Sequence, residues 1–287
     1  MSGAGEESAG ATAFYKLTGS GNDFVFFDER APGAADALAR FRTPAGIEAV
    51  CDRRNGVGAD GVVFVEAVAA RDVRIAYYNR DGTRAALCGN ATLCTARLAA
   101  VLGLVDRPDE PFVVATDAGR IDARVPARGD PVIALGPVRD VAAGAAAVVP
   151  GSAEQAIGYA LAGVPHLVVL VDDVARVDLD RRGAELRASN AARPAGANVN
   201  WVSRVGDRWR MRTFERGVEG ETLACGTGAV AAATLIARWT GAAGPIELVT
   251  SSGRAVEVTP AADGANALLA GEGRLVFRGK LDALPNA

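Results

Sequence analysis

A pattern that occurs twice in the 287-residue chain constrains its fold more than any other feature. Each copy has an apolar strand-like stretch, a polar turn, a Cys-Gly pair and an alanine-rich stretch typical of a buried helix. The first copy begins at Ile75 and carries Cys88, and the second begins at Met211 and carries Cys225, almost half a chain length further on. The repeat predicts two halves of similar build that face each other. The alternative is two unrelated buried cysteines.

Apolar and β-branched runs alternate with helical stretches along the whole chain, which predicts the α+β class. Ala118-Gly119 marks a hairpin between two of the strands. Helices are expected over residues 43–53, 93–104, 179–190 and 229–239. Strands are expected over residues 24–27, 62–65, 73–77, 113–115, 121–125, 132–135, 167–171, 199–205, 208–214, 246–250, 255–259, 267–270 and 275–278.

Charge and residue usage exclude several classes of function. A net charge of −3 gives no basic face for a nucleic acid, and no apolar run is long enough for a membrane span. Lys16 and Lys280 are the only lysines, and neither is well placed for a pyridoxal-phosphate Schiff base. His166 is the only histidine, and Cys88 and Cys94 lack zinc-site spacing. We therefore expect no cofactor, no metal, no nucleic-acid partner and no membrane association.

The chain begins with thirteen small and polar residues that lack the basic and apolar regions of a signal peptide. We expect residues 1–13 to form a disordered tail and the protein to be cytoplasmic, where thiols stay reduced. We expect residues 14–128 with 275–287 to form one half and residues 129–274 the other. Cys51 and Cys94 are interpreted as structural thiols.

Two cysteines at helix starts suggest acid–base chemistry. The positive end of a helix dipole and its unpaired N–H groups lower a thiol pKa from about 8.5 towards neutrality. Thiolate and thiol are then both available, as a general base and a general acid. Inversion of a carbon that bears hydrogen needs a base on one face and an acid on the other, and Cys88 and Cys225 would supply one each. Backbone N–H groups beside Gly89 and Gly226 could bind a carboxylate.

Short motifs along almost the whole chain from about Phe14 resemble the diaminopimelate epimerase family in their order and spacing. They are residues 17–24, 56–61, 78–82, 88–90, 164–166, 198–200 and 215–228. The resemblance implies two pseudo-symmetric domains, each a curved, mostly antiparallel sheet around a central helix, with the active site in the cleft between them. It also implies interconversion of LL- and meso-diaminopimelate, and often a homodimer.

The resemblance assigns the site residue by residue. Cys88 and Cys225 would be the two acid/base thiols, and His166 and Glu215 would tune them. The backbone around Gly89-Asn90 and Gly226-Thr227 would hold the reacting carboxylate. Four polar side chains would hold the far end of the substrate, which arginine and asparagine suit chemically: Asn22, Asn79, Asn198 and Arg216. Glu215 is also expected among the substrate-binding residues.

The sequence departs from the family pattern at several positions. Val164 stands where the family usually has a substrate-contacting asparagine, and Gly61 stands where some members have glutamine. Ala91 replaces a usual glycine, and Phe277 replaces a tyrosine that is common at the dimer contact. The loop after Arg216 also carries one extra residue. Val164 motivates one alternative, an epimerase or racemase of another amino acid, and a thiol-based redox or binding module is the alternative from another class.

Overall fold

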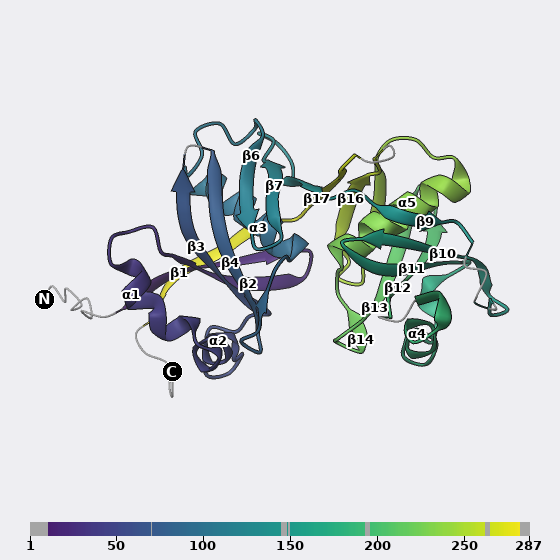
Figure 1. Ribbon diagram of the computed structural model, residues 1–287, viewed down its shortest axis with the longest axis horizontal. Coiled ribbons are helices and arrows are strands. Elements are labelled where there is room, and N and C mark those ends of the chain that lie inside the picture. The colour runs from purple at the N-terminus through teal and green to yellow at the C-terminus, as the bar shows by residue number, and fades with distance from the viewer. Residues whose placement is uncertain are drawn as a thin grey trace, which may run out of the picture. The chain divides into compact units, whose positions relative to one another are not determined.

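The computed structural model describes residues 11–69, 71–144, 148, 150–192, 196–261 and 265–281. The chain divides into two compact units (Figure 1). Unit 1 contains residues 1–129 and 273–287, and unit 2 contains residues 130–272. The chain therefore leaves unit 1, builds unit 2 and returns to unit 1 for its last strand.

Unit 1 has eight strands and three α-helices among the described residues. A 3₁₀ helix, Ala39–Arg42, joins the first two helices. The strands are β1 (Thr12–Gly19), β2 (Asn22–Asp28), β3 (Gly61–Ala69), β4 (Asp72–Asn79), β5 (Arg84–Ala85), β6 (Phe112–Thr116), β7 (Gly119–Arg124) and β18 (Arg274–Leu281). The helices are α1 (Ala34–Leu38), α2 (Pro44–Cys51) and α3 (Gly89–Val101).

Unit 2 has ten strands and two α-helices among the described residues. Short 3₁₀ helices cover Val174–Arg176 and Asn190–Ala192. The strands are β8 (Val132–Leu135), β9 (Arg139–Ala142), β10 (Glu154–Ala162), β11 (Val164–Val171), β12 (Asn198–Val205), β13 (Arg208–Glu215), β14 (Gly220–Thr222), β15 (Ile246–Val249), β16 (Ala255–Thr259) and β17 (Ala267–Gly271). The helices are α4 (Leu179–Arg187) and α5 (Gly226–Thr240).

The strands of the two units pair in the same order and directions. In unit 1 the order is β18-β1-β2-β3-β4-β6-β7, with β5 also paired to β4. In unit 2 the order is β9-β10-β11-β12-β13-β15-β16, with β14 also paired to β13 and with β17 and β8 added beyond β16. Only β2–β3 and β4–β6 are parallel in unit 1, and only β11–β12 and β13–β15 in unit 2. The predicted α+β class is confirmed.

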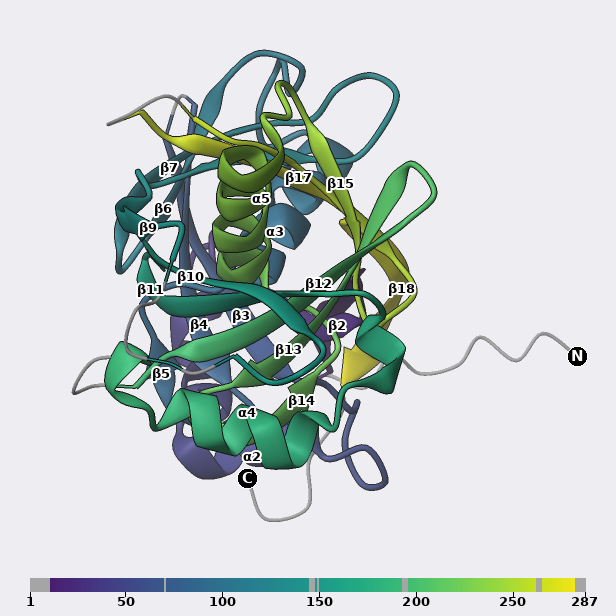
Figure 2. The same cartoon turned by 90° about the vertical axis from the view of Figure 1, so that its right-hand side faces the viewer.

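Each sheet curves around one apolar helix of its unit. Helix α3 contacts β1, β18, β6 and β7, and α5 contacts β10, β11, β12, β15, β16 and β17. Figure 2 shows α5 inside the sheet of unit 2. Nine of the thirteen residues of α3 and eight of the fifteen residues of α5 are buried, as expected for helices whose apolar faces pack on a sheet. None of the helices in the described ranges is long and apolar enough to span a membrane.

The structure adds elements that the sequence patterns missed. Strand β1 begins at Thr12, so the last two residues of the expected tail belong to the sheet; residues 1–10 lie outside the described ranges. Strands β9 and β10 were not expected. Strand β10 is rich in alanine and carries Gly158, which weakens a strand pattern. The small residue is needed because a Cβ at Gly158 would lie 2.8 Å from the side chain of Leu235 in α5.

Candidate active site

Cys88 is the residue immediately before α3 and takes the N-cap position. Its backbone is extended, with φ −136° and ψ 117°, and its carbonyl accepts a bond of 2.9 Å from the Thr92 N–H. The cysteine side chain makes no capping hydrogen bond to the helix. The N–H groups of the first turn are therefore left for another partner.

Cys225 has the same place before α5. Its backbone angles are φ −132° and ψ 107°, and its carbonyl accepts a bond of 2.9 Å from the Ala229 N–H. It too makes no side-chain cap, although its sulfur lies 3.6 Å from the hydroxyl oxygen of Thr227, a contact in which either atom can donate. The Cys-Gly pairs of the repeat thus occupy equivalent backbone positions in the two units.

The other two described α-helices of eight or more residues begin differently. Thr43 caps α2 by accepting from the Gly46 N–H at 3.0 Å, and Asp178 caps α4 by accepting from the Arg181 N–H at 3.3 Å. Hydroxyl and carboxylate oxygens are the usual N-caps, and they satisfy donors that a thiol leaves open. The helix starts at Cys88 and Cys225 are therefore the ones suited to an anion.

The predicted site residues Asn22 and Asn90 are in direct contact within unit 1. The Asn90 amide donates a hydrogen bond of 2.6 Å to Asn22 Oδ1, and the Asn22 amide donates one of 3.2 Å to Asp60 Oδ2. Because Asn90 belongs to the first turn of α3, this chain of bonds fixes the β1–β2 turn against the helix start at Cys88.

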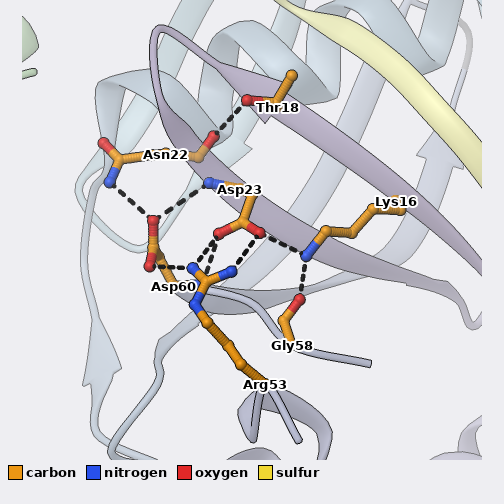
Figure 3. Close-up of polar contacts among 7 residues, drawn as sticks. All are labelled: Lys16, Thr18, Asn22, Asp23, Arg53, Gly58 and Asp60. Atoms are coloured by element: carbon orange, nitrogen blue, oxygen red, sulfur yellow. Dashed lines mark hydrogen bonds and ion pairs between the residues drawn. The ribbon is translucent and has the colours of Figure 1, made fainter. Parts of the chain in front are cut away.

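A charged cluster of Lys16, Asp23, Arg53 and Asp60 lies next to Asn22 (Figure 3). Asp23 accepts two bonds from Arg53, of 2.7 and 3.0 Å, and pairs with Lys16 at 2.7 Å. Lys16 also donates to the Gly58 carbonyl, and Arg53 reaches Asp60 Oδ1 at 2.8 Å. Burial of Asp23 opposes ionisation, but the bonds from Arg53 and Lys16 prevail and lower its pKa to about 2. Asp60 therefore links this cluster to Asn22.

Asn79 lies at the end of β4, beside a tyrosine that was not among the predicted site residues. The hydroxyl of Tyr77 donates a bond of 3.0 Å to Asn79 Oδ1, and the Asn79 amide donates one of 3.1 Å to the hydroxyl of Thr83. Tyr77 and Cys88 also line the same small cavity of unit 1. Alternation along a strand places residues 77 and 79 on one face, so the contact could have been found from sequence once the strand was assigned.

In unit 2, Asn198 fixes the turn that carries Arg216. Asn198 Oδ1 accepts a bond of 2.8 Å from the Arg216 backbone N–H, and the Arg216 guanidinium reaches the Gly196 carbonyl at 3.4 Å. Glu215 is the last residue of β13, and burial raises its pKa. Asn198 is therefore bonded to the residue that follows Glu215 at the end of β13, and the roles of these three residues stay predictions.

His166 lies in the core of unit 2 on β11 and is fully buried. Burial, followed by the charge of Arg216, lowers the pKa of His166 to about 3, so the ring is neutral at working pH. The amide of Asn200 lies 3.2 Å from His166 Nδ1 and donates to the Leu167 carbonyl at 3.1 Å.

Asn200 connects His166 to the start of α5. Its Oδ1 accepts a bond of 3.0 Å from Thr213. A Cβ added to Gly228 would lie 2.3 Å from this oxygen and 3.2 Å from the sulfur of Cys225. The first turn of α5 thus packs directly on Asn200. Sequence reasoning did not select this residue, although it belongs to one of the motifs.

None of the four cysteines forms a disulfide. Cys51 and Cys94 are buried, and burial raises the pKa of Cys51 to about 12. That thiol is therefore a poor base, in keeping with the structural role expected for it. Among the described residues, no three His, Cys, Asp or Glu side chains are grouped as a metal site would need.

Comparison with known proteins gives one consistent result. The family model described as diaminopimelate epimerase matches residues 14–141 and 158–276. The diaminopimelate epimerase of Gemmatimonas aurantiaca is 47% identical over 285 residues, covering 95% of this chain and 100% of the relative. That of Aquifex aeolicus is 36% identical, covering 93% of this chain and 97% of the relative.

Two solved structures share the fold at low sequence identity. A hydroxyproline epimerase from Agrobacterium vitis matches with a TM-score of 0.65 at 18% identity, over 96% of this chain and 94% of that one. A Bacillus anthracis protein of the PhzF family matches with a TM-score of 0.67 at 14% identity, over 94% and 99%. With a family model that covers most of the sequence and relatives that align end to end, the chain belongs to the diaminopimelate epimerase family.

Proposed function

We propose that this protein interconverts LL- and meso-2,6-diaminopimelate with two thiols and no cofactor. Family membership gives the activity and the substrate. The observation that supports the mechanism is the equivalence of Cys88 and Cys225, each at the uncapped start of the central helix of its unit.

The reaction needs one proton to leave the α-carbon and one to arrive on its opposite face. One cysteine, as thiolate, takes the α-proton and becomes a thiol. The other, as thiol, gives its proton to the carbanion and becomes a thiolate. The reverse reaction exchanges the two roles, so the same pair serves both directions.

The carbanion next to a carboxylate needs stabilisation, because an amino-acid α-proton is very weakly acidic. The open N–H groups at the starts of α3 and α5 suit the reacting carboxylate, with Gly89, Asn90, Gly226 and Thr227 around it. Such donors are fixed before the reaction begins, so they do not need to reorganise when charge develops.

The far end of diaminopimelate carries a carboxylate and an ammonium group. Arg216 suits the carboxylate, and amide groups can accept from the ammonium. Asn22, Asn79, Asn198 and Glu215 complete the proposed set. A shorter amino acid would leave these polar groups without partners, and this would select against it.

The proposed effects of His166 and Glu215 on the thiols differ in kind. His166 is neutral, so it acts on Cys225 through the position of Asn200 and not as a cation. Glu215 has a raised pKa, and a short turn joins its strand to β14, the strand that precedes Cys225. Its protonation would remove a negative charge near the forming thiolate.

We also place the protein in the cytoplasm and expect it to act as a homodimer. A mechanism that uses two free thiols needs a compartment that keeps them reduced. The dimer proposal is supported by β18, which presents the exposed apolar side chains of Val276 and Phe277. Exposed apolar groups on an outer strand are typical of a surface that pairs.

Single substitution of either thiol tests the mechanism. Cys88→Ser and Cys225→Ser should each lower kcat by about 10³-fold, because a hydroxyl is a much weaker acid than a thiol and is not ionised near neutral pH to act as the base. Cys51→Ala, a buried thiol outside the site, is the matched control and should retain turnover. Full turnover in either serine variant would contradict the two-thiol mechanism.

Deuterium exchange tests the substrate. In heavy water, LL-diaminopimelate should give meso product labelled at the inverted carbon, and single-centre amino acids should stay unlabelled. Label entering only a single-centre amino acid would reassign the substrate. Addition of a chelator should leave the rate unchanged.

A further inference from the structure

We propose that the phenol of Tyr77 is a positioning residue for Cys88, which holds the sulfur by a reversible hydrogen bond and favours its thiolate form. The inference rests on the proposed function, since it gives Cys88 a proton to exchange. It adds a residue that the motifs of the family resemblance did not select.

Tyr77 and Cys88 meet at one edge of unit 1. Both line the same small cavity, together with Ala85 and Thr92. The Tyr77 hydroxyl donates to Asn79 Oδ1 at 3.0 Å, and the charge of Cys88 and hydrogen bonding with it contribute to the raised pKa of the phenol. The phenol therefore shares its cavity with the thiol while its proton is directed to an amide oxygen.

Asn79 is held so that its oxygen faces Tyr77. Its amide nitrogen donates to Thr83 Oγ1 at 3.1 Å, and Thr83 in turn donates to Asp81 Oδ1 at 2.6 Å. Because the nitrogen is occupied, the amide does not rotate to present a donor to the phenol. The Tyr77 proton consequently has two acceptors, Asn79 Oδ1 and the Cys88 sulfur.

The two acceptors match the two states of Cys88. When Cys88 is a thiol, its S–H donates to the phenol oxygen and the phenol donates to Asn79. When Cys88 is a thiolate, the phenol turns its O–H to the sulfur. No proton leaves the phenol, and only the direction of the bond changes. The bond to the charged sulfur is the stronger one, so the phenol favours the thiolate.

Tyr77 stays protonated throughout. Burial, followed by the charge and the hydrogen bond of Cys88, raises its pKa far above the ordinary value of tyrosine. The phenol is therefore a donor at every working pH.

Gly61 explains how the chain accommodates this side chain. A Cβ at position 61 would lie 2.6 Å from the Tyr77 ring and 3.1 Å from its hydroxyl oxygen. The ring also packs edge-on against Phe24, with centroids 6.0 Å apart. Glycine at position 61, a departure from the family pattern, leaves the space that the phenol fills.

Tyr77→Phe removes the hydroxyl and keeps the ring contact with Phe24. The measurement is the rate at which iodoacetamide alkylates Cys88 as a function of pH, followed on the Cys88 peptide by mass spectrometry. We expect the midpoint to move about one pH unit upwards, equal to a tenfold loss of thiolate at a fixed lower pH. The acid limb of kcat/KM should move with it.

Tyr78→Phe is the matched control, because Tyr78 packs against Phe64, with ring centroids 5.7 Å apart, in the core of the same unit. It should leave the alkylation midpoint unchanged. In Gly61→Ala the new Cβ would lie 2.6 Å from both the Tyr77 ring and the Tyr78 carbonyl, so a folded variant with the phenol displaced should shift the midpoint in the same direction as Tyr77→Phe.

An unchanged midpoint in a folded Tyr77→Phe protein would overturn the proposal while leaving the epimerase function intact. A second outcome would separate the role of Tyr77 from the proposed epimerase function. A shifted midpoint in a chain that does not epimerise diaminopimelate would retain the role of Tyr77 and reject the proposed function.

Discussion

Asn22 shows how much of the site depends on single amide groups. Its oxygen receives Asn90 from the first turn of α3, and its nitrogen is directed to Asp60, which Arg53 holds. Exchanging the oxygen and nitrogen would break both bonds. The charged cluster of Lys16, Asp23, Arg53 and Asp60 therefore orients a proposed substrate-binding amide as well as stabilising the β1–β2 turn.

Because Asp23 is ionised in this charged cluster, part of the free energy of unfolding is expected to depend on pH in the acid range. Asp23 has a folded-state pKa of about 2, below its ordinary value of 3.8. A depressed carboxyl pKa stabilises the folded state above the unfolded pKa, and this stabilisation is lost as pH falls through the folded pKa. Asp23→Asn should therefore lower the free energy of unfolding by about 2 kcal/mol at pH 7.

The measurement is chemical denaturation of both proteins between pH 7 and pH 2. The difference in free energy of unfolding between the parent protein and Asp23→Asn should stay constant down to about pH 4 and decrease towards pH 2. Asp109→Asn, at an exposed carboxyl outside the cluster, is the control and should change the free energy of unfolding little. A difference that stays constant down to pH 2 would show that Asp23 does not titrate as described.

For individual residues, the sequence suggested the reactive and substrate-binding side chains but not the residues that hold them in position. Cys88, Cys225 and the asparagines carry polar or reactive groups in recognisable motifs. Tyr77 and Asn200 act through contacts between strands, and those contacts depend on register and on the space left by Gly61 and Gly228. A motif does not encode register, so these roles needed coordinates.

Among the elements, α3 and α5 differ from their sequence predictions at the end that matters most. The alanine-rich patterns predicted starts at residues 93 and 229, whereas the helices begin at Gly89 and Gly226. Glycine is a poor helix former, so a pattern places the start too late. The four-residue and three-residue differences contain the N–H groups proposed to bind the carboxylate.

The start of α5 is predicted to tolerate no added methyl group. In Gly228→Ala the new Cβ would meet the Asn200 oxygen, which is held by Thr213 while the Asn200 nitrogen is held by Leu167. We expect a loss of about 1–3 kcal/mol in the free energy of unfolding from overpacking. A fall in kcat larger than that of a generally destabilised variant is also expected, because Cys225 would move.

Thermal unfolding and turnover of Gly228→Ala are to be compared with Gly136→Ala. A Cβ at Gly136 has no atom within 4 Å, so that variant should behave as the parent protein. Ala91 already occupies the corresponding position in α3, which shows that the constraint comes from Asn200 and not from the helix itself. Equal behaviour of the two variants would remove the packing role assigned to Asn200.

For the molecule as a whole, the repeat predicted the architecture better than any local pattern did. Two stretches with the same order of strand, turn, Cys-Gly and helix implied two similar units, and the strand pairings of the units agree. Residues 275–287 were expected to belong to the first half, but the sequence did not reveal that β18 pairs with β1 along its whole length, because a short apolar run carries no information on its partner.

The proposed homodimer gives the prediction at this scale. Phe277 on β18 is 46% exposed and touches Phe14 only edge-on, so Phe277→Arg should leave the fold intact. Light scattering coupled to gel filtration should show a dimer for the parent protein and a monomer for the variant. Val205→Arg, at an equally exposed apolar residue of β12, is the control and should remain dimeric. A parent protein that elutes as a monomer would reject the proposal.

The thiols that precede α3 and α5 provide the proposed acid and base at a cost in the stability of the fold. Serine or aspartate at each position would secure the first turn and raise the free energy of unfolding by about 1 kcal/mol. A chain selected only to resist heat would drift towards those residues. The sulfur atoms thus mark two helix starts where a stabilising cap is absent, and a stabilised catalyst would need compensating contacts at other positions.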